Sequence, residues 1–128
     1  MSNVKFVRWG AHCSVDCKAG NQTKVTDAEN IKAFSKELVK RIDMKAYGEP
    51  QVIHFGSENK AGYTLVQLIE TSNICAHLCD DSGDGYFDVF SCKPFDNEVV
   101  KKTIVEFFGP FESMRVSSFE RGVFEGLE

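Results

Sequence analysis

The chain has 128 residues, enough for one compact domain, and a formal net charge of −4. This charge disfavours a nucleic-acid partner, because phosphate binding needs a dense surface of Lys and Arg. No apolar run approaches the ~20 residues that span a bilayer, and the opening MSNVKFVRWG lacks the apolar segment of a signal peptide. We therefore expect a cytoplasmic protein with no membrane partner.

The first predicted strand covers about residues 4–17, and the first predicted helix follows it. Thr26 is the expected N-cap of this helix, and Glu29 three residues later completes a capping box. Gly48 and Pro50 are expected to end the helix. Along one helix face, three- and four-residue spacing predicts an apolar stripe of Ile31, Phe34, Leu38 and Ile42.

Strand-like segments joined by short turns fill the middle of the chain, at about residues 51–56, 62–70, 72–79 and 86–92. A second helix should start near Asp96, carry a stripe of Val100, Ile104, Phe107 and Phe108, and stop at Gly109-Pro110. A last strand follows at about 112–119. The order β-α-ββββ-α-β predicts an α+β fold. We expect residues 1–128 to form a single domain, a two-layer α/β sandwich whose largely antiparallel sheet carries two helices on one face.

Two runs of Cys and His, HCSVDC and CAHLC, raise the question of a metal site. Strand alternation would space Cys75, His77 and Cys79 about 7 Å apart along one strand face, which one zinc ion cannot easily bridge. The DDSGDG run at 80–85 imitates the start of a calcium loop, but Ser91 stands where an EF-hand needs a bidentate Glu. We therefore favour buried thiols and a hairpin turn, and expect no metal.

The spacing of three polar residues indicates a function that none of them indicates alone. Cys92 and His77 could form a nucleophile and base pair, and Ser72 stands five residues before His77 and twenty before Cys92. The run TSNICAHLCDDSGDGYFDVFSC resembles that of the small prokaryotic S-adenosylmethionine decarboxylases, a pyruvoyl-dependent family. The family's run has Glu-Ser-His, then a His, Thr-Trp-Pro-Glu and Asp-x-Phe-Thr-Cys. Ser72 falls on its self-cleaving Ser, His77 on its His and Cys92 on its catalytic Cys.

The resemblance extends over nearly the whole chain. WGAHCSVDCKAGN looks like the family's opening strand, GYTLVQLIETS like its approach to the cleavage site, and FGPFESMRVSSFERG like its closing strand. Thr64 falls on a Ser that helps processing in the family. The family's fold is a two-layer α/β sandwich, in agreement with the pattern of elements. Its members assemble at least as dimers, which implies a homodimer of cleaved protomers or a higher oligomer here.

The resemblance also implies a mechanism. Ser72 attacks the carbonyl of Thr71, with His77 and Thr64 as candidate proton shuttles. The chain then splits into residues 1–71 and 72–128, and Ser72 becomes a covalent pyruvoyl group, so that no external cofactor is needed. The pyruvoyl ketone forms a Schiff base with the substrate amine and acts as an electron sink. Cys92 is the candidate proton donor to the substrate after CO₂ leaves.

The sequence departs from the family's run at the site itself. Thr71 replaces the Glu before the Ser, Asn73 replaces the His after it, and Cys79, Asp80 and Asp81 replace the Trp, Pro and Glu. The Trp and Glu belong to the family's nucleoside-binding region, so Asn73, Cys79 and Asp81 are the candidate substrate-binding residues. Loss of an aromatic platform weakens adenine binding, since stacking is worth ~1–3 kcal/mol per base.

Three functions remain open at this point. The first is decarboxylation of S-adenosylmethionine, which gives the aminopropyl donor for spermidine synthesis. The second is decarboxylation of a basic amino acid, ornithine or arginine, with Asp81 holding the distal cation. The third is a relative that does not process itself and only binds a partner or regulates a related enzyme.

Overall fold

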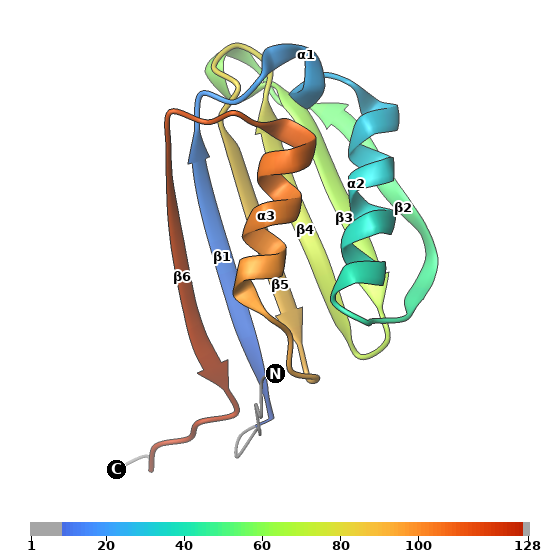
Figure 1. The fold of residues 1–128 in the computed structure, drawn as a ribbon, viewed down its shortest axis with the longest axis vertical. Helices are drawn as coiled ribbons and strands as arrows, with labels where there is room; N and C mark the ends of the chain where they lie inside the picture. The colour runs from blue at the N-terminus through green and yellow to red at the C-terminus, as the bar shows by residue number, and fades with distance from the viewer. Residues whose placement is uncertain (1–8, 127–128) are drawn as a thin grey trace.

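The computed structural model describes residues 9–126 and contains a six-stranded antiparallel sheet with its helices on one face (Figure 1). The strand order is β2-β3-β4-β5-β1-β6, and every neighbouring pair runs antiparallel. This confirms the predicted two-layer α+β sandwich. The predicted start of the first strand, residues 4–8, lies outside the described residues. No helix within 9–126 is long and apolar enough to cross a membrane.

Six strands and three α-helices make up the fold of residues 9–126. The strands are β1 (Gly10–Lys18), β2 (Ala46–Phe55), β3 (Gly62–Ile69), β4 (Ser72–Cys79), β5 (Gly85–Ser91) and β6 (Ser113–Arg121). The helices are α1 (Gln22–Val25), α2 (Ala28–Arg41) and α3 (Asn97–Phe108), and a 3-10 turn, η1, covers Glu58–Lys60. The one-turn helix α1 is an addition to the two helices predicted from the sequence.

Both predicted ends of α2 were wrong. The N-cap is Asp27, whose carboxylate accepts hydrogen bonds from the backbone N–H groups of residues 29 and 30, whereas Thr26 closes α1. Helix α2 ends at Arg41, with residue 42 as its C-cap, because the apolar stripe that holds the helix to the sheet stops there. Gly48 and Pro50 instead lie inside β2, where the register with β3 shifts in a bulge.

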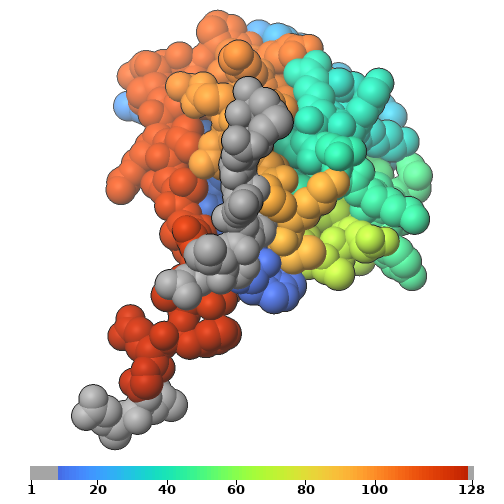
Figure 2. Space-filling model, turned by 60° about the horizontal axis from the view of Figure 1, so that its bottom comes forward, coloured from blue at the N-terminus to red at the C-terminus, as the bar shows by residue number. Residues whose placement is uncertain are grey.

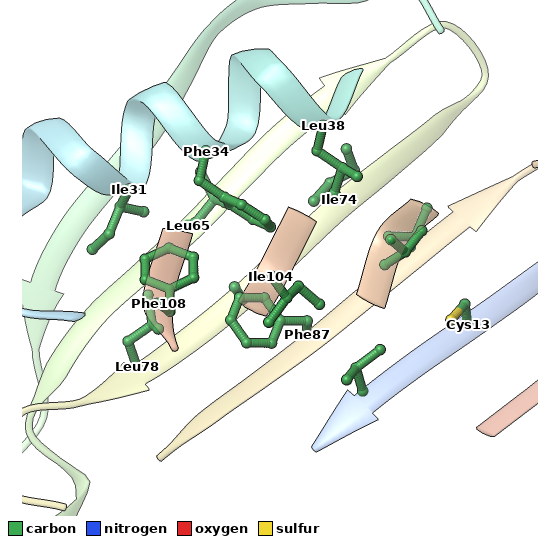
Figure 3. Close-up of a cluster of buried hydrophobic side chains, with 14 of the residues drawn as sticks. Cys13, Ile31, Phe34, Leu38, Leu65, Ile74, Leu78, Phe87, Ile104 and Phe108 are labelled. Atoms are coloured by element: carbon green, nitrogen blue, oxygen red, sulfur yellow. The ribbon is translucent and has the colours of Figure 1, made fainter. Parts of the chain in front are cut away.

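The core fills the space between the helices and one sheet face (Figure 3). Phe34 of α2 packs edge to face against Phe108 of α3, with ring centroids 4.9 Å apart, and against Phe87 of β5 at 5.5 Å. Each fully buried side chain of this size contributes about 1.5–3 kcal/mol relative to an exposed one. This layer makes the sheet a rigid base for the residues at its edges and on its other face.

The second sheet face, which we call the open face, has no described helix over it. Four of its large apolar side chains are about half exposed: Ile53 (56%), Phe55 (57%), Leu68 (47%) and Phe119 (55%). Strand alternation and register add polar groups to the same face: His12, Ser14, Thr64, Asn73, Cys75, His77, Tyr86 and Asp88. A sheet face that mixes exposed apolar groups with polar ones is typical of a contact surface.

Candidate active site

The β3–β4 hairpin places the Thr71–Ser72 bond at the tip of a two-residue turn. Residues 69 and 72 pair across this turn, which leaves Glu70 and Thr71 to reverse the chain. Thr71 adopts φ 62°, in the left-handed region. That conformation is unusual for a β-branched residue and costs about 1–2 kcal/mol. The bond that the sequence marks for cleavage therefore follows directly on a strained residue.

Cys92 reaches the same bond from the end of β5. Its backbone N–H donates to Ser72 Oγ over 3.0 Å, and its Sγ lies 2.6 Å from Thr71 Oγ1. Thr71 Oγ1 donates its one proton to the carbonyl of Glu70, at 2.6 Å, so the thiol is the donor toward the Thr71 oxygen. The structure thus brings together three of the residues selected from the sequence: Thr71, Ser72 and Cys92.

A cavity of about 280 Å³ opens beside this bond, between the hairpin and two neighbouring segments. Figure 2 views the molecule from this end and shows the yellow-green hairpin tip at the surface, near the amber segment after β5 and the teal segment after α2. The lining residues are Asp43, Met44, Lys45, Glu70, Thr71, Cys92 and Lys93. Thr71, at one end of the predicted cleavage bond, is therefore accessible to a small molecule.

His77 and Thr64 form a second centre on the open face. They pair across β4 and β3, and His77 Nδ1 lies 2.8 Å from Thr64 Oγ1. His77 Nε2 lies 2.8 Å from the carbonyl of Lys60. A carbonyl only accepts, so Nε2 carries the proton and the neutral ring accepts from the Thr64 hydroxyl at Nδ1. This arrangement holds the imidazole in one tautomer, with Nδ1 as the acceptor toward the Thr64 hydroxyl.

The two centres are not brought together within one chain. Ser72 and His77 both belong to β4, five residues apart, which is roughly 16 Å of extended strand. They also point to opposite faces, because Ser72 pairs with the core residue Ile69 whereas His77 pairs with Thr64 on the open face. His77 therefore lies toward the β4–β5 turn, at the end of the sheet opposite the hairpin tip (Figure 1).

The candidate substrate-binding residues lie at both ends of β4. Asn73 lies beside Ser72 on the open face, where its Oδ1 accepts from the Cys75 thiol at 3.5 Å. Cys79 and Asp81 lie at the other end and line a cavity of about 380 Å³ together with His77. The remaining lining residues of that cavity are Asn59, Lys60, Ser82, Asp84 and Tyr86.

Four of the five cysteines are poorly suited to acid-base work. Burial, followed by the charge of Asp88, raises the pKa of Cys13 to about 11. Burial, followed by Asp16, raises the pKa of Cys17 to about 12. Burial also raises the pKa of Cys75 and of Cys79. In the part of the chain that the structure describes, no three His, Cys, Asp or Glu side chains form a group that could hold a metal ion.

A protein-family model described as S-adenosylmethionine decarboxylase matches residues 11–122. The chain belongs to the S-adenosylmethionine decarboxylase family. This confirms the resemblance inferred from the motifs and the expectation that the chain is a decarboxylase. Among solved structures, the chain is similar to the adenosylmethionine decarboxylase of Aquifex aeolicus VF5, with a TM-score of 0.77, 21% identity, and coverage of 94% of this chain and 97% of that one. That likeness shows the fold. No curated protein matches the sequence significantly.

Sequence reasoning missed two groups in this member of the decarboxylase family. Asp88 Oδ1 accepts from Ser14 Oγ at 2.9 Å and lies 3.0 Å from His12 Nε2, which forms a polar network on the open face. Asp80, where the family has Pro, has an Oδ2 that lies 2.6 Å from His54 Nε2 and so ties the β4–β5 turn to β2. Two-residue alternation on β1 could have predicted that His12 and Ser14 share one sheet face. Their contact with Asp88 could not have been predicted in this way, because it depends on the register between β1 and β5.

Proposed function

We propose that the chain is a self-processing, pyruvoyl-dependent S-adenosylmethionine decarboxylase that makes the aminopropyl donor for spermidine synthesis. The observation that carries the proposal is the cleavage end of the sheet, where strained Thr71 precedes Ser72 and Cys92 contacts both residues. Family membership supplies the reaction class. A cytoplasmic location agrees with five cysteines that all remain free thiols.

The local contacts favour attack of Ser72 Oγ on the Thr71 carbonyl. The N–H of Cys92 holds Ser72 Oγ at 3.0 Å, which limits the hydroxyl's freedom. Conversion of the Thr71–Ser72 amide to an ester frees Thr71 from the left-handed conformation, so strain in the precursor lowers the barrier. A pyruvoyl group is formed from a Ser residue, and Ser72, held by the N–H of Cys92, is that residue in this proposal.

Once formed, the pyruvoyl group supplies the electron sink for loss of CO₂. Groups next to residue 72 provide the proton and the access for the substrate. Cys92 lies within contact of the 71–72 junction and is the donor in its contact with Thr71 Oγ1, so its thiol is placed to protonate the substrate carbon. The cavity of about 280 Å³ gives the substrate's reacting end access to that thiol.

We further propose that the working form is a homodimer in which the open faces pack against each other. Ser72 and His77 lie too far apart to share a proton within one copy. A two-fold axis that lies between the two facing sheets, perpendicular to the strands, exchanges the strand ends and carries His77 of one copy to the cleavage end of the other. Because Ser72 faces the core side of the sheet, the shared site also requires Ser72, at the strand end, to turn its hydroxyl toward the open face. The exposed Ile53, Phe55, Leu68 and Phe119 supply the apolar surface for such packing.

A basic amino acid is the second candidate substrate, and one observation favours it. The His77 cavity holds Cys79, which is buried, in place of the family's Trp, and it exposes Asp81 with Asp84 also in the lining. This cavity offers acidic groups for a distal cation, and Tyr86, 44% exposed, is the aromatic group in its lining that could take the place of the Trp for adenine. Rates of CO₂ release from S-adenosylmethionine, ornithine and arginine decide between the substrates.

Intact mass after expression tests self-processing. The expected result is two fragments, residues 1–71 and residues 72–128, the second with a pyruvoyl-blocked amino terminus. The Ser72→Ala chain is the matched control and should stay whole. A wild-type chain that persists at 14.3 kDa refutes self-processing and favours the non-processing relative.

A further inference from the structure

We propose that Lys45 and Lys93 form a binding site for the carboxylate that cleavage creates at Thr71. This inference rests on the proposed self-processing. Both lysines line the 280 Å³ cavity that also exposes Thr71 and Cys92. They come from different segments: Lys45 lies in the loop before β2, and Lys93 directly follows Cys92.

The chemistry of cleavage explains why a cation is needed there. After the acyl shift, Thr71 is joined to Ser72 through an ester and the Ser72 nitrogen is a free amine. A base removes the Ser72 α-proton, the bond from Cβ to the ester oxygen breaks, and the electron pair leaves on the Thr71 carboxylate. The residue left behind is an enamine, which rearranges to an imine and takes up water to give the pyruvoyl ketone and ammonia. A new unit of negative charge therefore appears at Thr71.

A backbone contact holds Lys45 against the hairpin tip, and a second contact fixes the backbone of Lys93 within its own segment. The carbonyl of Lys45 accepts from the N–H of Glu70 at 2.9 Å, so Lys45 lies alongside the turn that contains Thr71. The N–H of Lys93 donates to Ser91 Oγ at 2.9 Å, which fixes the start of its side chain next to Cys92. Each four-carbon stem then lets the ammonium group move within the cavity.

The acidic residues near Lys45 and Lys93 do not fully neutralise the two lysines, so the cavity can bind a new anion. Asp43 and Glu70 are the acidic residues in the cavity lining. Lys93 Nζ donates to the Asp43 carbonyl at 2.6 Å and to Asp43 Oδ2 at 3.1 Å. The Asp43 carboxylate is 95% exposed, and ion pairs of that kind contribute little, so the charge of Lys93 is only weakly neutralised. Lys45 forms no ion pair with any residue in the described range. A carboxylate produced between them gains the uncommitted cation of Lys45 and can share the cation of Lys93 with Asp43.

The same site acts before and after bond breaking. A positive charge near the departing oxygen stabilises the carboxylate as it forms, so it speeds the elimination step. After cleavage, it holds residue 71 near the new amino terminus of the second fragment. The acyl shift itself creates no carboxylate, so loss of the lysines should slow the step after ester formation.

A pulse-chase experiment tests the site on the full chain. The wild type, Lys45→Met, Lys93→Met and the double variant are synthesised in a cell-free translation, and conversion of the whole chain to fragments is followed by mass. We expect each single variant to slow cleavage severalfold and the double variant to slow it at least tenfold. Arg at both positions keeps the charge and should restore cleavage to within about twofold. Lys102→Met, on the exposed side of α3, is the matched control and should cleave as the wild type does.

Hydroxylamine added during the chase identifies the blocked step, because it cuts esters. The double variant should yield a second fragment that begins with an unmodified Ser72. If the double variant cleaves at the wild-type rate, or stalls as a chain that hydroxylamine does not cut, the lysine site is refuted and self-processing stands. A wild-type chain that never cleaves refutes both.

Discussion

Co-expression of two inactive variants provides the sharpest test of the shared site. One chain carries Ser72→Ala and keeps His77. The other carries His77→Gln and keeps Ser72. Within a chain, about 16 Å of strand separates the two positions, whereas proton transfer needs about 3 Å or one bridging water. Neither chain alone should therefore cleave, and only a mixed dimer should contain a complete pair.

The expected yield follows from random association. With equal expression, about half of all dimers are mixed, and each mixed dimer has one complete Ser72–His77 pair and one pair without either group. About half of the His77→Gln chains should therefore be cut at 71–72, and decarboxylation should reach about one quarter of the wild-type level per chain. A tag on the His77→Gln chain lets its fragments be counted by intact mass.

Two outcomes would contradict the reasoning. If the mixture yields no cleavage while both variants fold and associate, Ser72 and His77 must act within one chain. If the His77→Gln chain cleaves fully when expressed alone, His77 has no part in processing. Size measurement of each variant distinguishes a failure to associate from a failure to react.

Three further outcomes are expected from the same geometry. Cys92→Ala should leave cleavage within a few fold of the wild type but lower decarboxylation by about 10² or more, because a general acid supplies at least that factor; unaffected turnover would remove Cys92 from this role. In the Ser72→Ala background, Thr71→Gly should raise the free energy of unfolding by about 1 kcal/mol in urea titrations, and in the cleaving chain it should slow processing. The pKa of Cys13 is raised to about 11 and that of Cys17 to about 12, first by burial. The unfolded chain loses these protons first, so the free energy of unfolding should fall from about pH 8.5 upward by ~1.4 kcal/mol per pH unit for each thiol. Cys13→Ala should reduce that slope, and an unchanged slope would refute the assignment.

Much of the fold follows from the sequence because its signals are local. The stripe from Ile31 to Ile42 and the alternation of β3, β4 and β5 identify the elements, and segregation of helices from strands leads to two layers. Helix ends were less predictable. Thr26 and Asp27 are both good capping residues, and only the position of α1 decides that Asp27 caps α2. Gly48 and Pro50 are equally typical of a helix stop and of a strand bulge.

For the site, the sequence by itself predicted which residues carry the chemistry, because the spacing of Ser72, His77 and Cys92 is a one-dimensional property. Tertiary structure decided how they combine. It brings Cys92 to the Thr71–Ser72 bond through the β4–β5 register, and it sends His77 to the far end of β4 on the other face. Strand parity and length set that separation, but only the exposed sheet face indicates that a second copy can bridge it. The φ of 62° at Thr71 is likewise set by the two-residue turn rather than by Thr itself.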